Sequence, residues 1–160
     1  MKALSLVLAA TLAGAGAPVL AGSAEVKFAD PQAYADIGGT RAQQFDNLER
    51  LARHIERLAQ RLPANQTLRV DVLDVDLAGT QFGLQPRVVR NMADIPRLHI
   101  RYSVVAGGQV VTSGEDYLSR LDYARSTDVN RSYVALYDEK RLLDEWFARR
   151  FGGQQQASRY

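Results

Sequence analysis

Three aspartates at short spacing are the residues of this chain that are best suited to chemistry. Asp71, Asp74 and Asp76 lie in one stretch of alternating polar and apolar residues. A hard cation such as Ca²⁺ requires several carboxylate or carbonyl oxygens, usually from a loop that wraps around the ion. A flat strand wraps an ion poorly, and the chain has no acidic glycine loop of the EF-hand type. The aspartates alone therefore do not establish a cation site.

A second interpretation of this acidic face needs no ligand. Opposite charges on adjacent strands pair across a sheet, and another alternating segment carries Arg97, His99 and Arg101 on one face. We therefore favour a solvent-exposed sheet face with cross-strand ion pairs. The alternative is a metal- or small-ligand-binding protein that uses Asp74 and Asp76 together with His99 and Arg101, and we assign it no cofactor.

A row of arginines marks the first long helical segment. Arg50, Arg53 and Arg57 recur at helical spacing, nearly opposite an apolar stripe. Guanidinium groups suit an anionic envelope polymer or an acidic envelope protein. The alternative is a solvated helix face whose charge is partly neutralised by Asp46 and Glu49 at i,i+4 spacing.

The chain contains no sequence motif of a familiar catalytic centre. It has two histidines and no cysteine, and neither His54 nor His99 has a second His or Cys at metal-ligand spacing. A nucleophile elbow, a P-loop and a dinucleotide-binding glycine fingerprint are all absent from the sequence. We therefore expect a non-enzymatic binding or envelope-assembly module, with a hydrolase that has a cryptic site as the weaker alternative.

Hydrophobic periodicity predicts the order strand, helix, strand, strand, strand, helix. The expected strands cover 24–29, 67–77, 97–104 and 109–118, and the expected helices cover about 41–62 and 138–151. Gly107 and Gly108 predict a tight hairpin between the last two strands. This order favours an α+β sandwich, with a mostly antiparallel sheet of about four strands and two helices on one face.

Local signals fix several details of these elements. Thr40 and Gln43 form a capping-box pattern at the start of the first helix, and Phe45 begins its expected apolar stripe. The apolar residues of 67–77 change phase once. A strand cannot change its buried face without an extra residue, so we predict a β-bulge near Val72 and Leu73.

The last helix has an unusually wide apolar arc. Its members are Leu142, Leu143, Trp146, Phe147 and Phe151. Either the helix lies between two surfaces of its own domain, or part of the arc, with Trp146 at its centre, contacts a partner. Arg150 falls within the arc, so it must reach solvent or find an acid.

Residues 1–21 have the three-part pattern of a secretory signal peptide. A single charge at Lys2 precedes an apolar run, and small residues lead to a cleavage site after Ala21, with Ala24 as the alternative. A lipoprotein would need a Cys at the position of Gly22. We therefore expect a periplasmic protein without a lipid anchor and without a stable membrane span after cleavage.

The mature chain is expected to form a single domain over 22–153, followed by a disordered tail over 154–160. Removing Lys2 from 20 basic residues leaves 19 against 18 acidic ones, which is a net charge of +1. This balance gives no indication of nucleic acid binding. The expected partner is an envelope protein or an anionic envelope polymer.

Several short segments resemble a known family. These segments are Val26–Pro31, Asp74–Gly79, Pro96–Tyr102, Tyr117–Leu118, Tyr137–Lys140 and Leu142–Phe147. In combination they resemble a group of small exported proteins of Gram-negative bacteria that are classed as a domain of unknown function. The resemblance implies export and a single domain, and it implies no catalytic residues.

Overall fold

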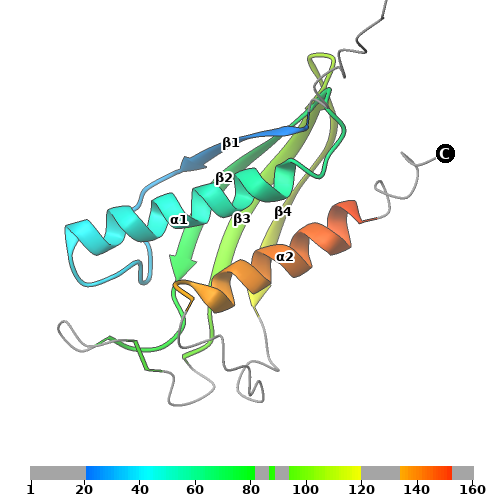
Figure 1. Ribbon diagram of the computed structural model, residues 1–160. Coiled ribbons are helices and arrows are strands. Elements are labelled where there is room, and N and C mark those ends of the chain that lie inside the picture. Colours follow the sequence, from blue (N-terminus) through cyan, green and yellow to red (C-terminus); the bar gives the residue numbers. More distant parts are fainter. Residues whose placement is uncertain (1–20, 82–86, 89–93, 120–133, 153–160) are drawn as a thin grey trace, which may run out of the picture.

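A computed structural model describes residues 21–81, 87–88, 94–119 and 134–152. The elements are β1 (Ser23–Phe28), α1 (Arg41–Ala59), β2 (Gln66–Asp76), β3 (Arg97–Ala106), β4 (Gln109–Ser119) and α2 (Tyr137–Phe151). This is the predicted order. The strands form one sheet in the order β1-β2-β3-β4, and both helices lie on one face of it (Figure 1).

Residues 1–20 of the expected leader and the expected tail, 154–160, lie outside the described residues. Within the described ranges, neither helix combines the length and the apolar character that spanning a bilayer requires.

The sheet is mixed, so the prediction of a mostly antiparallel sheet was wrong. β1 pairs with β2 in parallel, from Ser23 opposite Thr67 to Phe28 opposite Val72. The β2–β3 and β3–β4 pairs are antiparallel. The reason is the helix between β1 and β2, because α1 returns the chain to the end of the sheet where β1 began. Alternation of residues along a strand carries no information on this direction.

The predicted bulge in β2 is confirmed. The register of β2 against β3 shifts between Val72 and Asp74, so the two halves of β2 bury their apolar side chains on the same face. The carbonyl of Val72 accepts hydrogen bonds from the Ala29 amide at 3.0 Å and the Tyr34 hydroxyl at 2.7 Å. Burial raises the pKa of Tyr34 to about 12, so this hydroxyl remains a donor.

Helix α1 begins at the predicted capping box. The Thr40 hydroxyl accepts from the Gln43 amide at 3.3 Å, and the Gln43 side chain accepts from the Thr40 amide at 3.2 Å. The fully buried residues of the helix are Leu51, Ile55, Leu58 and Ala59. Phe45 is 72% exposed, which corrects its assignment to the apolar stripe, because packing against the core begins one turn later, at Leu48.

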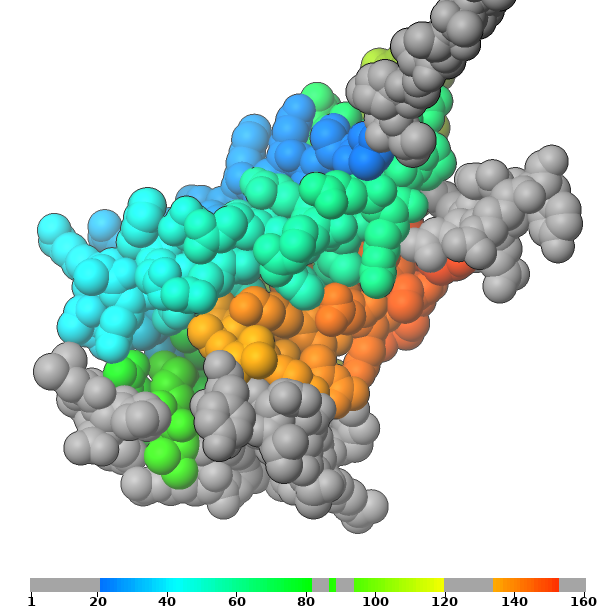
Figure 2. All heavy atoms as spheres, in the orientation of Figure 1, coloured from blue at the N-terminus to red at the C-terminus, as the bar shows by residue number. Residues whose placement is uncertain are grey.

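Helix α2 lies beside α1, and the two helices together cover this face of the molecule (Figure 2). Every member of its wide apolar arc is buried, and Trp146 is 1% exposed. The Tyr102 ring of β3 meets Trp146 edge-on at 5.4 Å between centroids. The arc is therefore filled by the domain itself, and the expectation that Trp146 offers a partner surface is corrected.

Two polar contacts fix α2 on the edge strand. The Asp116 carboxylate of β4 accepts from the Trp146 indole N–H at 2.9 Å and from the Arg150 Nε at 2.9 Å. The Asp116 carboxylate is thus the acidic partner that was expected for Arg150, which lies within the apolar arc. The neighbouring Gly114 leaves room for the core, because a Cβ there would lie 2.7 Å from the Tyr102 hydroxyl.

We expect Asp116→Asn to lower the free energy of unfolding at neutral pH by about 1–2 kcal/mol, because the charge-assisted bonds to Arg150 are lost. Hydrogen bonds from Arg150 and then Trp146 hold the pKa of Asp116 below its ordinary value of 3.8. This stabilisation is complete above pH 3.8 and disappears as pH falls through the lower pKa of the folded state.

Urea unfolding of wild type and variant at neutral pH and in strong acid measures the difference. Glu115→Gln on the same strand is the control and should change stability little, because Glu115 and its partner Arg101 are exposed. A stability difference of the same size in strong acid would contradict this assignment.

Candidate functional site

The face of the sheet opposite the helices carries polar and charged side chains from all four strands. The strand registers place them in rows: Glu25, Arg69, Ser103 and Ser113 in one, and Lys27, Asp71, Arg101 and Glu115 in the next. Alternation along each strand explains this, since every second residue of these segments is polar. We call this surface the open face.

The open face contains a depression of about 700 Å³. Three acidic and three basic side chains line it: Glu25, Asp71, Glu115, Lys27, Arg69 and Arg101. Arg69 bonds Glu25 at 2.9 Å, and Arg101 Nε bonds Glu115 at 3.0 Å. The depression therefore presents many hydrogen-bond donors and acceptors with balanced charge.

An aromatic platform adjoins this depression. The Tyr117 ring stacks on His99 with 3.8 Å between centroids and 16° between planes, and Tyr117 is 78% exposed. His99 Nε2 lies 2.8 Å from a Glu115 oxygen. Hydrogen bonds from His99 and Arg101 hold the pKa of Glu115 below its usual range, so Glu115 is a carboxylate at neutral pH.

The predicted cross-strand pairs are confirmed in part. Asp76 bonds Arg97 at 2.8 Å, as expected. His99 and Arg101 instead pair with Glu115 of β4. The sequence analysis did not include Glu115 or Tyr117 among the site residues, although the alternation of β4 could have placed both on the open face.

The Asp74 side chain has a structural role, because it binds backbone amides. Its Oδ1 accepts from the backbone amides of Ala35 and Val75, both at 2.9 Å. Asp74 and His99 are opposite each other in the register, but within the described ranges no three His, Cys, Asp or Glu residues form a group that could hold a metal ion. The structure therefore does not gather Asp74, Asp76 and His99 into a metal site.

The arginine row of α1 lies in the helix layer, away from the open face. Arg50 bonds Asp46 and Arg53 bonds Glu49, both at 2.6 Å, so the predicted i,i+4 pairs are confirmed. The third member, Arg57, lies 3.2 Å from His54 Nδ1. The row and the open face are thus two separate surfaces.

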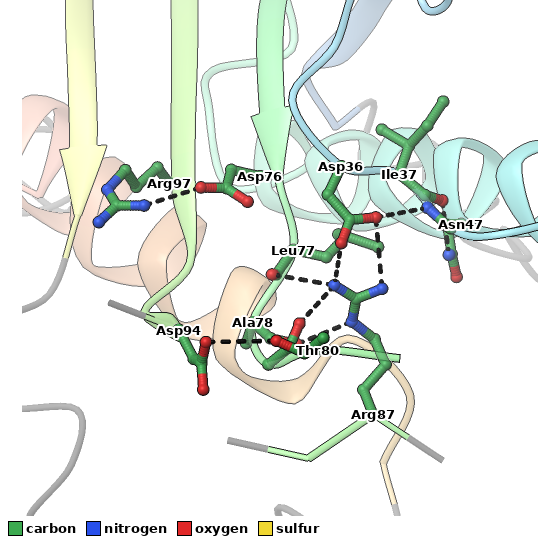
Figure 3. Close-up of polar contacts among 12 residues, drawn as sticks. Asp36, Ile37, Asn47, Asp76, Leu77, Ala78, Thr80, Arg87, Asp94 and Arg97 are labelled. Atoms are coloured by element: carbon green, nitrogen blue, oxygen red, sulfur yellow. Dashed lines mark hydrogen bonds and ion pairs between the residues drawn. The ribbon is translucent and has the colours of Figure 1, made fainter. Parts of the chain in front are cut away.

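A second cluster, which sequence reasoning missed, lies where β2 ends (Figure 3). Arg87 pairs with the Asp36 carboxylate at 2.5 Å and donates to the carbonyls of Leu77, Ala78 and Gly79 at 3.2, 2.8 and 2.6 Å. These contacts hold together segments that are far apart in the sequence. No local pattern marks Asp36 or Arg87, so their pairing was not predictable.

Glu139 completes this junction from the first turn of α2. It is 3% exposed, and its Oε1 accepts from the Ala78 amide at 2.6 Å. Burial raises the pKa of Glu139 above its ordinary range. Its only sequence signal was its place in Tyr137–Lys140, one of the segments that carry the family resemblance. The contacts of this junction join backbone groups of segments that are distant in the sequence, so we assign it a structural role.

Comparisons with known proteins give one match. Residues 22–149 match a family model described as "Protein of unknown function (DUF3016)". The search of curated proteins and the search of solved structures gave no match. The family description names no activity, so the assignment of the site depends on its geometry.

We expect Glu139→Gln to change how stability depends on pH. The raised pKa means that the folded state holds this proton more tightly than the unfolded chain does. Wild type therefore loses stability as pH rises from about 4.5 through the folded-state pKa. The variant keeps an acceptor for the Ala78 amide and lacks this loss, so its advantage in Tm should grow with pH.

Thermal unfolding of both proteins from acidic to neutral pH tests this expectation. Glu139→Ala is the companion variant, and it should cost about 1–3 kcal/mol because the buried Ala78 amide loses its acceptor. Parallel pH profiles of wild type and Glu139→Gln would show that another group titrates.

Proposed function

We propose that this chain is a non-enzymatic binding module of the cell envelope, and that its open face binds a polyhydroxylated polymer of the glycan kind. The chain belongs to the family described as protein of unknown function (DUF3016). The observation that carries the proposal is the depression of about 700 Å³ on a sheet face that neither helix covers.

The charge balance of the depression selects the ligand class. Its three acids and three bases lie in alternating order, with two close ion pairs among them. A ligand of high net charge meets as many like charges as opposite ones, so it gains little. Hydroxyl and amide groups gain from both kinds, because they donate to carboxylates and accept from guanidinium groups.

The Tyr117 platform supports the same ligand class. The stack on His99 holds one face of the ring, and most of the side chain is open to solvent. Because the stack already restricts the Tyr117 side chain, ligand binding loses little side-chain conformational entropy there. A ring beside a row of hydrogen-bonding groups fits a sugar unit, which has an apolar face and a polar rim.

A second candidate is an anionic polymer bound at the arginine row of α1. The favouring observation is Lys140 of α2, whose pKa is lowered by burial and by the nearby Arg50 and Arg57. This places a fourth cation beside Arg50, Arg53 and Arg57. Arg50 and Arg53 already form ion pairs with acidic side chains of the same helix. We therefore rank the arginine row below the open face as a binding surface.

The hydrolase alternative receives less support from the described residues. A general acid must hold a proton near neutral pH. Glu115, beside the platform, has its pKa lowered by His99 and Arg101, so it would enter the reaction already ionised. We therefore retain binding without catalysis as the proposal.

The packing of Gly22 supports export with cleavage after Ala21. The Gly22 amide donates to the Leu62 carbonyl at 3.1 Å, and a Cβ at this position would lie 2.6 Å from the Ala59 carbonyl oxygen. Cleavage after Ala24 would remove this contact together with two residues that pair with β2. The family match also begins at residue 22. We thus propose a periplasmic protein that starts at Gly22.

The glycan proposal predicts that the purified protein sediments with cell-wall sacculi and binds a tetramer of N-acetylglucosamine in calorimetry. Tyr117→Ala should weaken binding about three- to ten-fold, which corresponds to the loss of one aromatic stacking contact. Arg101→Gln, in the middle of the sheet, should weaken binding through lost charge-assisted hydrogen bonds.

Phe45→Ala is the matched control, because Phe45 is about as exposed as Tyr117 but lies on α1. Arg53→Glu with Arg57→Glu separates the two candidates. Loss of sacculus binding in this double variant, with Tyr117→Ala unchanged, would move the site to the arginine row. Absence of binding by wild type would end the glycan proposal.

The export proposal predicts the mass of the mature protein. Intact mass spectrometry of protein recovered from a periplasmic extract should give a chain that begins at Gly22. A chain that begins at Glu25, or a full-length chain in the membrane fraction, would contradict cleavage after Ala21.

A further inference from the structure

We infer that the outer edge of β4 is a self-association surface, on which a second copy of this chain adds its own β4 in antiparallel orientation. An edge strand has a row of backbone N–H and C=O groups available to another strand. Among the described residues, no strand pairs with β4 on the side away from β3. The occupant we assign is a second copy because the residues of β4 complement themselves.

Exposed apolar side chains concentrate on this strand. Six large hydrophobic side chains are exposed in the described part of the chain, and three of them, Val110, Val111 and Tyr117, lie on β4. The opposite edge is shorter, since β1 has six residues, and none of its large hydrophobic side chains is among the exposed ones. Short edges resist pairing, whereas long edges with exposed apolar side chains favour it. The eleven residues of β4 therefore make it the associating edge.

The order of residues along β4 selects one register. When the two-fold axis passes through Gly114, Val111 lies opposite Tyr117 of the second copy, and Ser113 lies opposite Glu115 of the second copy. Val111 and Tyr117 thus meet across the interface, and the Glu115 carboxylate meets a hydroxyl group. A closed two-fold dimer requires this kind of self-complementarity.

Neighbouring registers are less favourable. An axis through Glu115 would place that carboxylate opposite its own copy, and an axis through Asp116 would do the same for Asp116. Like charges directly opposite each other destabilise a strand pair. A register shift in the β3–β4 pairing leaves Val111 as the extra residue of a bulge, so the pairing extends over residues 111–117.

In this dimer Val111 of the second copy lies beside Tyr117, whose ring stacks on its cross-strand neighbour His99. The two sheets become one continuous surface that carries two depressions and two platforms. The inference shares Tyr117 with the glycan proposal but is tested separately through Val111, which does not line the depression.

Sedimentation velocity of the purified protein over the micromolar range should show a monomer–dimer equilibrium. Val111→Lys should raise the dimer dissociation constant at least about ten-fold, because a lysine on an edge strand opposes pairing. Val111 is 55% exposed, so this variant should keep the fold, which circular dichroism verifies. Phe45→Lys is the matched control and should leave the dimer intact.

The chain contains no cysteine, so single-cysteine variants report the register without background. Ser113→Cys mixed with Glu115→Cys should form a disulfide-linked pair, because directly opposed residues lie about 4.5–5.5 Å apart. Either variant alone should cross-link poorly, since its diagonal separation is about 7–8 Å. A monomer throughout the range, a dimer insensitive to Val111→Lys, or equal cross-linking of the single variants would overturn the inference.

Discussion

The bulge in β2 is the constraint on which the remaining architecture depends. A central strand of eleven residues must keep one face against the helices over its whole length, although its apolar residues change phase. The extra residue after Val72 restores the phase, and the Val72 carbonyl is directed toward β1. Tyr34 and the end of β1 bind that carbonyl, so the connection to α1 starts from a fixed position.

Downstream of the bulge, the residues of the Asp74–Gly79 segment act as a structural junction. Asp74 holds the connection after β1, and the three carbonyls that follow β2 accept from Arg87. This segment of the family resemblance is thus occupied with the fold, whereas two other such segments place His99, Arg101 and Tyr117 on the open face.

Local signals predicted local structure, and contacts distant in sequence were not predictable. The capping box at Thr40 and the bulge at Val72 each depend on a few consecutive residues, and both were predicted. The parallel pairing of β1 depends on how α1 packs, and the contact of Asp36 with Arg87 spans 51 residues. Phe45 has helical spacing but lies beyond the packed part of α1, a fact that the period of a sequence does not encode.

The parallel β1–β2 pair also has a consequence for how the chain folds. Ser23 pairs with Thr67, 44 residues later, whereas β3 and β4 are joined by two glycines and close locally. Loop closure makes the distant pairing slow relative to the hairpin. A chain that emerges from its N-terminus presents β1 first, yet β1 has no partner until α1 and β2 have followed. Val26 and Phe28 therefore remain without their sheet neighbours during this interval, when unpaired apolar strands are prone to aggregate.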